Sequence, residues 1–111
     1  MLFIIIFTTV PASSPQNVTA ISLSSTAIMV TWEEVPPIDR NGMITTYEIL
    51  YEPLETFGQL SSTDIINATD LSVILEGLHP FVGYNISVRA YTSVGSGPYS
   101  DVVVEKTLED S

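Results

Sequence analysis

The stretch GLHPFVGYNISVRA, residues 77–90, decides the fold of this chain. Its second half alternates between two kinds of side chain. The apolar ones are Tyr84, Ile86, Val88 and Ala90, and the polar ones are Asn85, Ser87 and Arg89. A period of two places successive side chains on opposite faces of a β-strand. We therefore expect a strand with its apolar face in a core and with Asn85, Ser87 and Arg89 on an exposed sheet surface.

Other segments on both sides of this stretch show the same period. Alternating apolar positions recur around 28–32, 47–51 and 71–75, and 102–107 looks like a last strand. Turn residues separate them, including the pairs Pro36-Pro37 and Asn41-Gly42, whereas the polar stretch 59–69 is weaker and places Asn67 in a loop. About seven short strands and no 3.6-residue amphipathic pattern predict an all-β sandwich or barrel.

The order and spacing of several landmarks resemble the fibronectin type III family across residues 11–107. The landmarks are Pro15, Val18, Trp32, Tyr47-x-Ile49-x-Tyr51, Gly77-Leu78-His79-Pro80, Tyr84, Ile86-x-Val88-x-Ala90, Gly95-x-Gly97-Pro98-x-Ser100 and Thr107. The resemblance implies an immunoglobulin-like sandwich of seven antiparallel strands, in sheets of three and four joined by Greek-key connections. The loops at 41–44 and 94–100 are similar to repeats of neural adhesion molecules and receptor tyrosine phosphatases.

The resemblance also implies a structural core built on Trp32, Tyr47, Leu78 and Tyr84. Tyr84 would form a corner in which its hydroxyl bonds to upstream backbone, with Leu78 filling the core beneath it. Two functions of the family do not carry over. The loop at 93–98 lacks the Arg-Gly-Asp of integrin-binding members, and the paired cysteines and Trp-Ser-x-Trp-Ser motif of cytokine receptors are missing.

The composition excludes several classes of partner and chemistry. Three basic residues against thirteen acidic ones leave a formal charge of −10. Binding of nucleic acid or a heparin-like polyanion needs clustered Lys and Arg, so we expect neither. The chain has no Cys, which excludes disulfides and thiolate metal sites. We expect no cofactor and no metal.

The residues that could support catalysis do not form a recognisable set. His79 is the only His, without the further ligands or triad partners that zinc or acyl-transfer sites need. The Gly95-Ser96-Gly97 spacing precedes Pro98 and a strand, whereas a phosphate loop leads into a helix. Acidic residues at 33, 34 and 39 could hold calcium weakly, but a solvated rim is the default interpretation. We expect a chain that is not an enzyme.

Three N-glycosylation sequons begin at Asn17, Asn67 and Asn85. Chance predicts roughly one in a chain of this Ser and Thr content. This excess favours glycosylation at all three and an extracellular or cell-surface location, although chance in a Ser/Thr-rich domain is the alternative.

The first ten residues differ from the rest. The apolar run Leu2–Phe7 is far shorter than the ~20 residues that span a membrane, so we expect no direct membrane insertion by the domain. Residues 1–10 fit either a signal peptide cleaved ahead of Ser13 or a truncated start. We predict a domain over residues 11–107, with residues 108–111 as a linker or tail.

These observations favour a non-catalytic interaction or spacer module of a cell-adhesion or receptor protein. Its partners would be other proteins, including neighbouring modules of the same chain. Two alternatives remain open at this point: an accessory module of a secreted multidomain enzyme, and an intracellular module of a cytoskeletal array.

Overall fold

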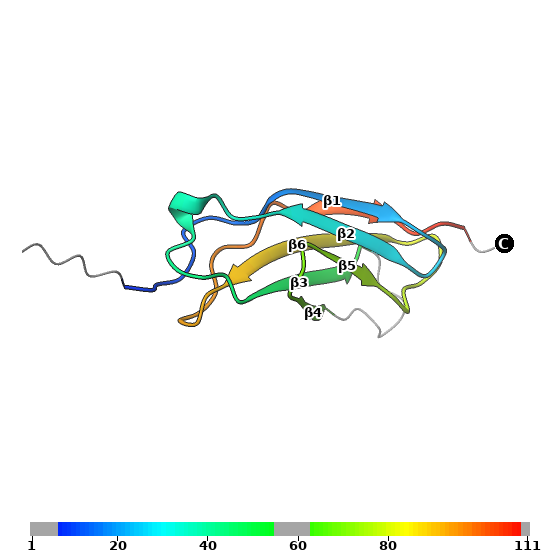
Figure 1. Ribbon diagram of the computed structural model, residues 1–111. Coiled ribbons are helices and arrows are strands. Elements are labelled where there is room, and N and C mark those ends of the chain that lie inside the picture. Colours follow the sequence, from blue (N-terminus) through cyan, green and yellow to red (C-terminus); the bar gives the residue numbers. More distant parts are fainter. Residues whose placement is uncertain (1–6, 55–62, 110–111) are drawn as a thin grey trace, which may run out of the picture.

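The computed structural model describes residues 7–54 and 63–109, which form two β-sheets packed face to face (Figure 1). The strands are β1 (Gln16–Ser22), β2 (Ile28–Glu33), β3 (Thr46–Pro53), β4 (Asp64–Ala68), β5 (Ser72–Leu75), β6 (Gly83–Tyr91) and β7 (Val103–Lys106). One sheet has the order β1-β2-β5 and the other the order β4-β3-β6-β7, with every neighbouring pair antiparallel. The predicted seven-stranded sandwich is confirmed.

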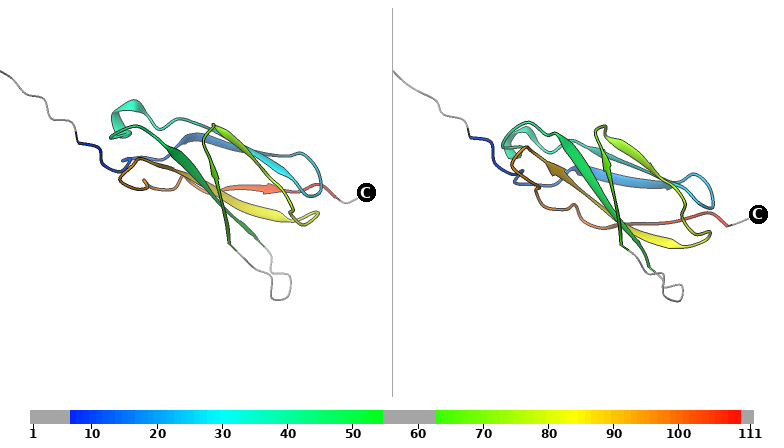
Figure 2. Two further views of the ribbon diagram at one scale, coloured as in Figure 1. Left: turned by 60° about the horizontal axis from the view of Figure 1, so that its bottom comes forward. Right: turned by 90° about the horizontal axis from the view of Figure 1, so that it is seen from below.

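The chain changes sheet after β2, after β4 and again after β5. Figure 2 shows the strands in two further views, of which the right-hand one is from below. The described residues contain no α-helix, and their one helical turn is the 3-10 turn η1 (Pro37–Asp39). No described helix is long and apolar enough to cross a membrane. The chain enters at one end of the sandwich and leaves at the opposite end (Figure 1).

The core lies between the sheets and follows from the alternation of the strands. Ile28, Val30 and Trp32 of β2 face inward, and β3 and β6 pair over eight residues from Thr46 opposite Tyr91 to Pro53 opposite Tyr84. The four residues expected in the core are 3–6% exposed: Trp32, Tyr47, Leu78 and Tyr84. The centroids of the Trp32 and Tyr47 rings are 5.4 Å apart, and the ring planes are tilted by 57° to each other. Aromatic pairs in proteins prefer tilted arrangements at this distance.

The corner before β6 is held by hydrogen bonds to the backbone. The Tyr84 hydroxyl accepts a hydrogen bond of 2.9 Å from the His79 amide, five residues upstream, as the family resemblance implies. The Leu78 amide donates to the carbonyl of Thr26 at 3.0 Å, which ties this corner to the loop before β2. Gly77 adopts φ +69°, a left-handed conformation that glycine enters without steric cost.

The fold extends to residues before Pro11. The Thr9 amide donates to Asn41 at 2.8 Å, the Thr92 hydroxyl donates to the Thr9 carbonyl at 2.7 Å, and the Asn41 side chain donates to Val10 at 3.1 Å. Pro11 is fully buried. Contacts with the sandwich therefore begin two residues before the predicted start at Pro11, and cleavage ahead of Ser13 would remove them. The apolar run Leu2–Phe7 lies outside the described residues except for Phe7, which is exposed.

One expectation about exposure and one about secondary structure are wrong. Ser87 is only 6% exposed, and Asn85 and Arg89 are half-buried, although all three point away from the core. Alternation fixes the direction of a side chain, but the outer face of this sheet carries large side chains of its own, such as Leu50 opposite Ser87. Asn67 lies in strand β4 and not in a loop, because residues 64–68 pair with β3.

Candidate interaction surfaces

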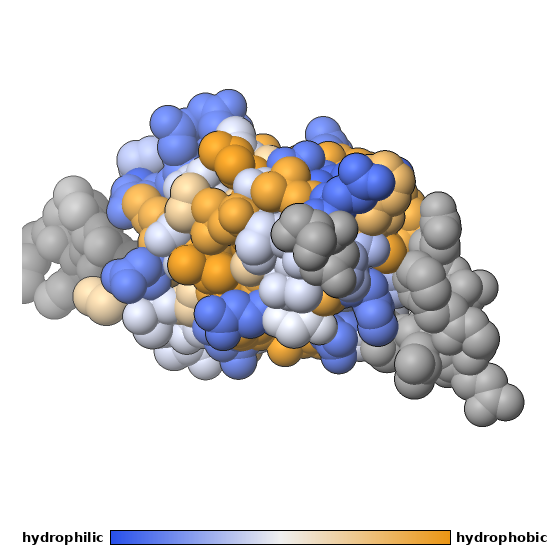
Figure 3. Space-filling view, turned by 90° about the vertical axis from the view of Figure 1, so that its right-hand side faces the viewer, coloured by the Kyte–Doolittle hydropathy of each residue, from blue (hydrophilic) through white to orange (hydrophobic). Residues whose placement is uncertain are grey.

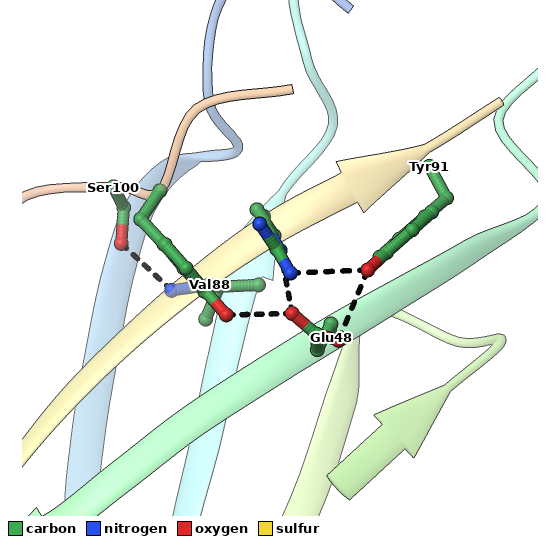
Figure 4. A network of polar contacts seen from close by, with 6 residues as sticks. Glu48, Val88, Tyr91 and Ser100 are labelled. Atoms are coloured by element: carbon green, nitrogen blue, oxygen red, sulfur yellow. Dashed lines mark hydrogen bonds and ion pairs between the residues drawn. The ribbon is translucent and has the colours of Figure 1, made fainter. Parts of the chain in front are cut away.

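The outer face of the four-stranded sheet carries a network of polar side chains (Figure 4). At its centre, Glu48 of β3 lies opposite Arg89 of β6 in the strand register. Arg89 Nε donates to Glu48 Oε2 at 2.5 Å, Tyr99 donates to the same oxygen at 2.6 Å, and Tyr91 donates to Oε1 at 3.1 Å. The Arg89 guanidinium also donates to the Tyr91 hydroxyl at 3.1 Å. Both carboxylate oxygens of Glu48 are therefore occupied.

Tyr99 reaches this face because its segment runs beside β6. The Gly97 amide donates to Ala90 at 2.9 Å, and the Ser100 amide donates to Val88 at 2.8 Å. The Val88 amide in turn donates to the Ser100 hydroxyl at 3.0 Å. The Arg89 guanidinium then stacks 4.4 Å from the centroid of the Tyr99 ring, a cation–π contact that holds the ring over the sheet.

The network shifts the pKa values of its members in directions that keep it intact at neutral pH. Burial alone would raise the pKa of the Glu48 carboxyl, but hydrogen bonds from Tyr99, Arg89 and Tyr91 outweigh burial and lower its pKa below 4.5. Burial and the neighbouring Glu48 carboxylate raise the pKa of Tyr99 to about 12. A general base needs a pKa near the working pH, so these shifts favour a structural ion pair over proton transfer.

The outer face of the three-stranded sheet is different in character. Ile21, Met29 and Ile74 lie side by side across β1, β2 and β5, because the register pairs Ile21 with Met29 and Met29 with Ile74. Ile21 is 54% exposed and Ile74 is 45% exposed. The next outward row contains hydroxyl side chains, with the Thr19 and Thr31 oxygens 2.5 Å apart. This face is an apolar row beside a hydroxyl row, without the charged network of the other sheet.

The two ends of the sandwich also expose apolar side chains. At the end where the chain enters, the exposed residues are Phe7, Ile38, Met43 and Val94. At the opposite end, Leu23, Phe81 and Leu108 are about half exposed, and the Phe81 amide donates to Leu108 at 3.1 Å. Figure 3 looks onto this second end and shows hydrophobic residues among hydrophilic ones. We call these two surfaces the entry pole and the exit pole.

No group of three or more metal-ligating side chains lies together in the described residues. Among the acidic residues considered as a weak calcium site, Glu34 pairs with Arg40 at 2.8 Å and Glu33 accepts a hydrogen bond from the Asn17 side chain. One oxygen of each of these two carboxylates is thus engaged within the protein. His79 lies in the exposed corner before β6.

A model of the fibronectin type III domain matches residues 13–106, nearly the whole sandwich. The chain belongs to the fibronectin type III family. The predicted resemblance is confirmed, including its similarity to adhesion molecules and receptor phosphatases.

Two relatives and one solved structure illustrate what this fibronectin type III chain is similar to. Protein sidekick-1 of Gallus gallus is 39% identical over 103 residues, which cover 92% of this chain and 5% of that protein. Receptor-type tyrosine-protein phosphatase F of Bos taurus is 40% identical over 102 residues, covering 90% of this chain and 5% of that protein. The solution structure of the third fibronectin III domain of human KIAA0343 protein has a TM-score of 0.82 at 29% identity, covering 92% of this chain and 86% of that one. This chain therefore spans a small fraction of the relatives' length.

The sequons of this fibronectin type III domain lie in three different settings. Asn67 is exposed on the edge strand β4, Asn85 is half-buried on β6, and Asn17 is exposed at the start of β1. The outward direction of Asn67 and Asn85 places both on the outer face of the four-stranded sheet.

Sequence reasoning did not find the network of Glu48, Arg89, Tyr91 and Tyr99. A signal was present, because Glu48 and Arg89 are opposite charges at outward positions of two alternating strands. Their register and the path of the segment carrying Tyr99 depend on contacts between distant parts of the chain, which alternation does not specify.

Proposed function

We propose that this fibronectin type III domain is a non-catalytic link in the extracellular part of a cell-adhesion or receptor protein. In this role it holds neighbouring modules at its two poles and offers the outer face of the three-stranded sheet to another protein. The observation that carries the proposal is the position of the chain ends. The described segments that lead to them lie at opposite ends of the sandwich (Figure 1). Exposed apolar side chains, such as Phe7 and Leu108, belong to these segments.

The exposed residues at the poles support contacts with adjacent modules. Phe7 is 75% exposed and Met43 is 82% exposed at the entry pole, and Phe81 is 54% exposed at the exit pole. Apolar side chains gathered on one surface favour an interface, since burying them removes their area from water. A module that continues the chain at either pole is tethered beside these side chains, so even a small apolar contact can be populated.

The engagement of the positive charges supports proteins, and not polyanions, as partners. Arg40 pairs with Glu34, Arg89 pairs with Glu48, and the Lys106 ammonium lies 3.6 Å from the centroid of the Phe81 ring. These are the three basic residues of the sequence. With each one engaged inside the domain and a formal charge of −10, little positive surface is left to attract nucleic acid or heparin-like chains.

The relatives support the location and the role. They include a cell adhesion molecule and a receptor-type phosphatase, and each is many times longer than this chain. A domain that makes up 5% of such a protein acts as one unit among many.

Surface labelling of the parent protein tests the location. An antibody raised against this domain should stain cells that express the complete parent protein before permeabilisation. Staining that appears only after permeabilisation would contradict the proposal and favour the intracellular array module.

A two-module protein tests the role of the exit pole. The domain joined to its natural C-terminal neighbour should show restricted motion between modules by NMR relaxation, and Phe81→Ser should loosen it. Ile74→Ser is the matched control, because Ile74 is similarly exposed but lies on the sheet face. Equal loosening by both variants, or by neither, would contradict a role for the pole.

A further inference from the structure

The three sequons are equally good matches to the glycosylation motif. In the folded domain they differ in the free space around the side-chain amide of each asparagine. An N-linked sugar replaces one hydrogen of the asparagine Nδ2 and adds a bulky hydrated group that must project into solvent. An acceptor in the folded domain therefore needs an exposed amide with space beside it.

Asn17 meets this requirement poorly. Its Nδ2 already donates a hydrogen bond to the Glu33 carboxylate on the neighbouring strand. Its backbone has φ +51° at the point where the register of β1 and β2 shifts. This conformation is uncommon for residues other than glycine, and asparagine is among those that adopt it most often. A sugar on this amide would have to fit around the contact with Glu33.

Asn85 lies between two strands of the four-stranded sheet. The register places it opposite Glu52 of β3 and opposite Val104 of β7, and its side chain is half-buried. A sugar there would start from a partly enclosed position with neighbours on both sides.

Asn67 has the most open setting of the three. It is exposed and points outward from β4, which among the described residues pairs with β3 alone and forms the edge of the four-stranded sheet. Its side chain borders an open hollow of about 320 Å³, which Thr45, Thr46, Glu48, Tyr91 and Thr92 also line. A hydrogen bond joins Tyr91 to Glu48 at this hollow, so two of its lining side chains belong to the polar network.

We propose that Asn67 is the principal N-glycan acceptor of this domain, with the first sugars lying over the hollow beside Tyr91. Thr46 and Tyr91 line the hollow with a hydroxyl group and an aromatic ring, which suit the polar and apolar faces of a sugar ring. The glycan stands at the open edge of β4, where unpaired backbone N–H and C=O groups can form hydrogen bonds with a strand of another molecule. It therefore shields that edge, next to which Ile65 is 56% exposed. The inference rests on the proposed extracellular function, because the sugar is added in the secretory pathway.

The test is direct analysis of the glycan on each sequon. The 111-residue chain is expressed in eukaryotic cells behind a cleavable secretion signal, and the secreted protein is treated with peptide N-glycosidase. The enzyme converts each glycosylated Asn to Asp, so peptide mass spectrometry reports each occupancy on the wild-type fold. We expect Asn67 to be converted to a greater extent than Asn17 or Asn85. Conversion of Asn17 or Asn85 that equals or exceeds that of Asn67 would overturn the assignment.

Variants provide a second measurement. N67Q and Thr69→Ala each destroy the same sequon, and both should lose the same glycan mass, whereas N17Q should keep most of it. Agreement between the two variants separates loss of the acceptor from a local folding defect. Retention of the full glycan mass in either variant would overturn the proposal.

Shielding of the edge has its own readout. After enzymatic removal of the glycan, sedimentation velocity should show a larger fraction of self-associated protein at the same concentration, and Ile65→Lys should reverse this increase. An unchanged fraction after glycan removal would overturn the shielding role.

These experiments separate failure of the site from failure of the function. The added secretion signal brings the chain to the glycosylation machinery whatever its natural route. An unmodified Asn67 therefore counts against the acceptor, and absent surface staining of the parent protein counts against the extracellular location.

Discussion

The outer faces of the two sheets show the same alternation in sequence but differ in what happens to their side chains. On the three-stranded sheet, Ile21 and Ile74 remain about half exposed. On the four-stranded sheet, Glu48 is 8% exposed although it points away from the core, because Arg89, Tyr91 and Tyr99 surround it. Alternation predicts the direction of a side chain, and the surroundings of the face determine its burial. The apolar face leaves its side chains exposed, whereas the charged centre of the polar face is occupied by its own contacts.

The largest expected effect comes from the core that supports both faces. Trp32→Ala should reduce the free energy of unfolding by about 3–5 kcal/mol, because it leaves a large cavity between the sheets. Trp32→Phe is the matched control and should cost less, because it keeps an aromatic ring. It also removes an indole N–H that has no hydrogen-bond partner in the part of the chain that the structure describes. Urea denaturation measures both, and a Trp32→Ala protein as stable as the wild type would contradict the core assignment.

The next effect breaks the polar face. Glu48→Gln should reduce the free energy of unfolding by about 1–3 kcal/mol, because it removes the charge that Arg89 and the two tyrosines bind. Arg89 keeps 26% of its side chain exposed, so water limits the loss. Glu76→Gln, at an exposed position, should stay within about 0.5 kcal/mol of the wild type. Equal losses in the two variants would remove the distinction between this network and an ordinary surface charge.

The pH dependence sharpens the same comparison. The pKa of Glu48 is lower in the folded domain than in the unfolded chain, so its contribution to stability is present above about pH 4.5 and is lost as the pH falls toward the folded value. The pKa of Tyr99 is raised from 10.0 to about 12, so stability should also fall as the pH rises across that range. Glu48→Gln should flatten the acid side of a plot of melting temperature against pH, and Tyr99→Phe the alkaline side. Unchanged slopes would show that the network does not couple to titration.

The smallest effect is expected on the apolar face. Ile74→Thr keeps a β-branched side chain at an exposed strand position and should change the free energy of unfolding by no more than about 0.5 kcal/mol. Thermal unfolding measures the change. A loss comparable to that of Glu48→Gln would mean that this face, too, supports the fold.

Part of the candidate surface could be predicted from the sequence. The sequons at Asn17, Asn67 and Asn85 are local motifs, so any reading of the chain finds them. Their surroundings are not local. The sequence suggested a loop for Asn67, but residues 64–68 form the edge strand because they pair with β3, which follows from the hydrophobic register of two segments. The entry pole and the exit pole could not be predicted from the sequence either, because each combines residues from several separate loops.

The sequence by itself identified the family, through the order and spacing of landmarks such as Trp32 and Tyr84, and that resemblance implied the two-layer sandwich. Alternation and turn residues, which act over a few neighbouring positions, predicted the short strands. The sequence also determined the acidic charge and the shortage of basic residues. Only the tertiary structure decided that Ser87 is buried on an outward face, that Thr9 and Val10 belong to the fold, and that Tyr99 caps the ion pair of Glu48. Each of these depends on segments that are distant in sequence and come into contact only when the sheets pack. Local sequence patterns do not specify such long-range contacts.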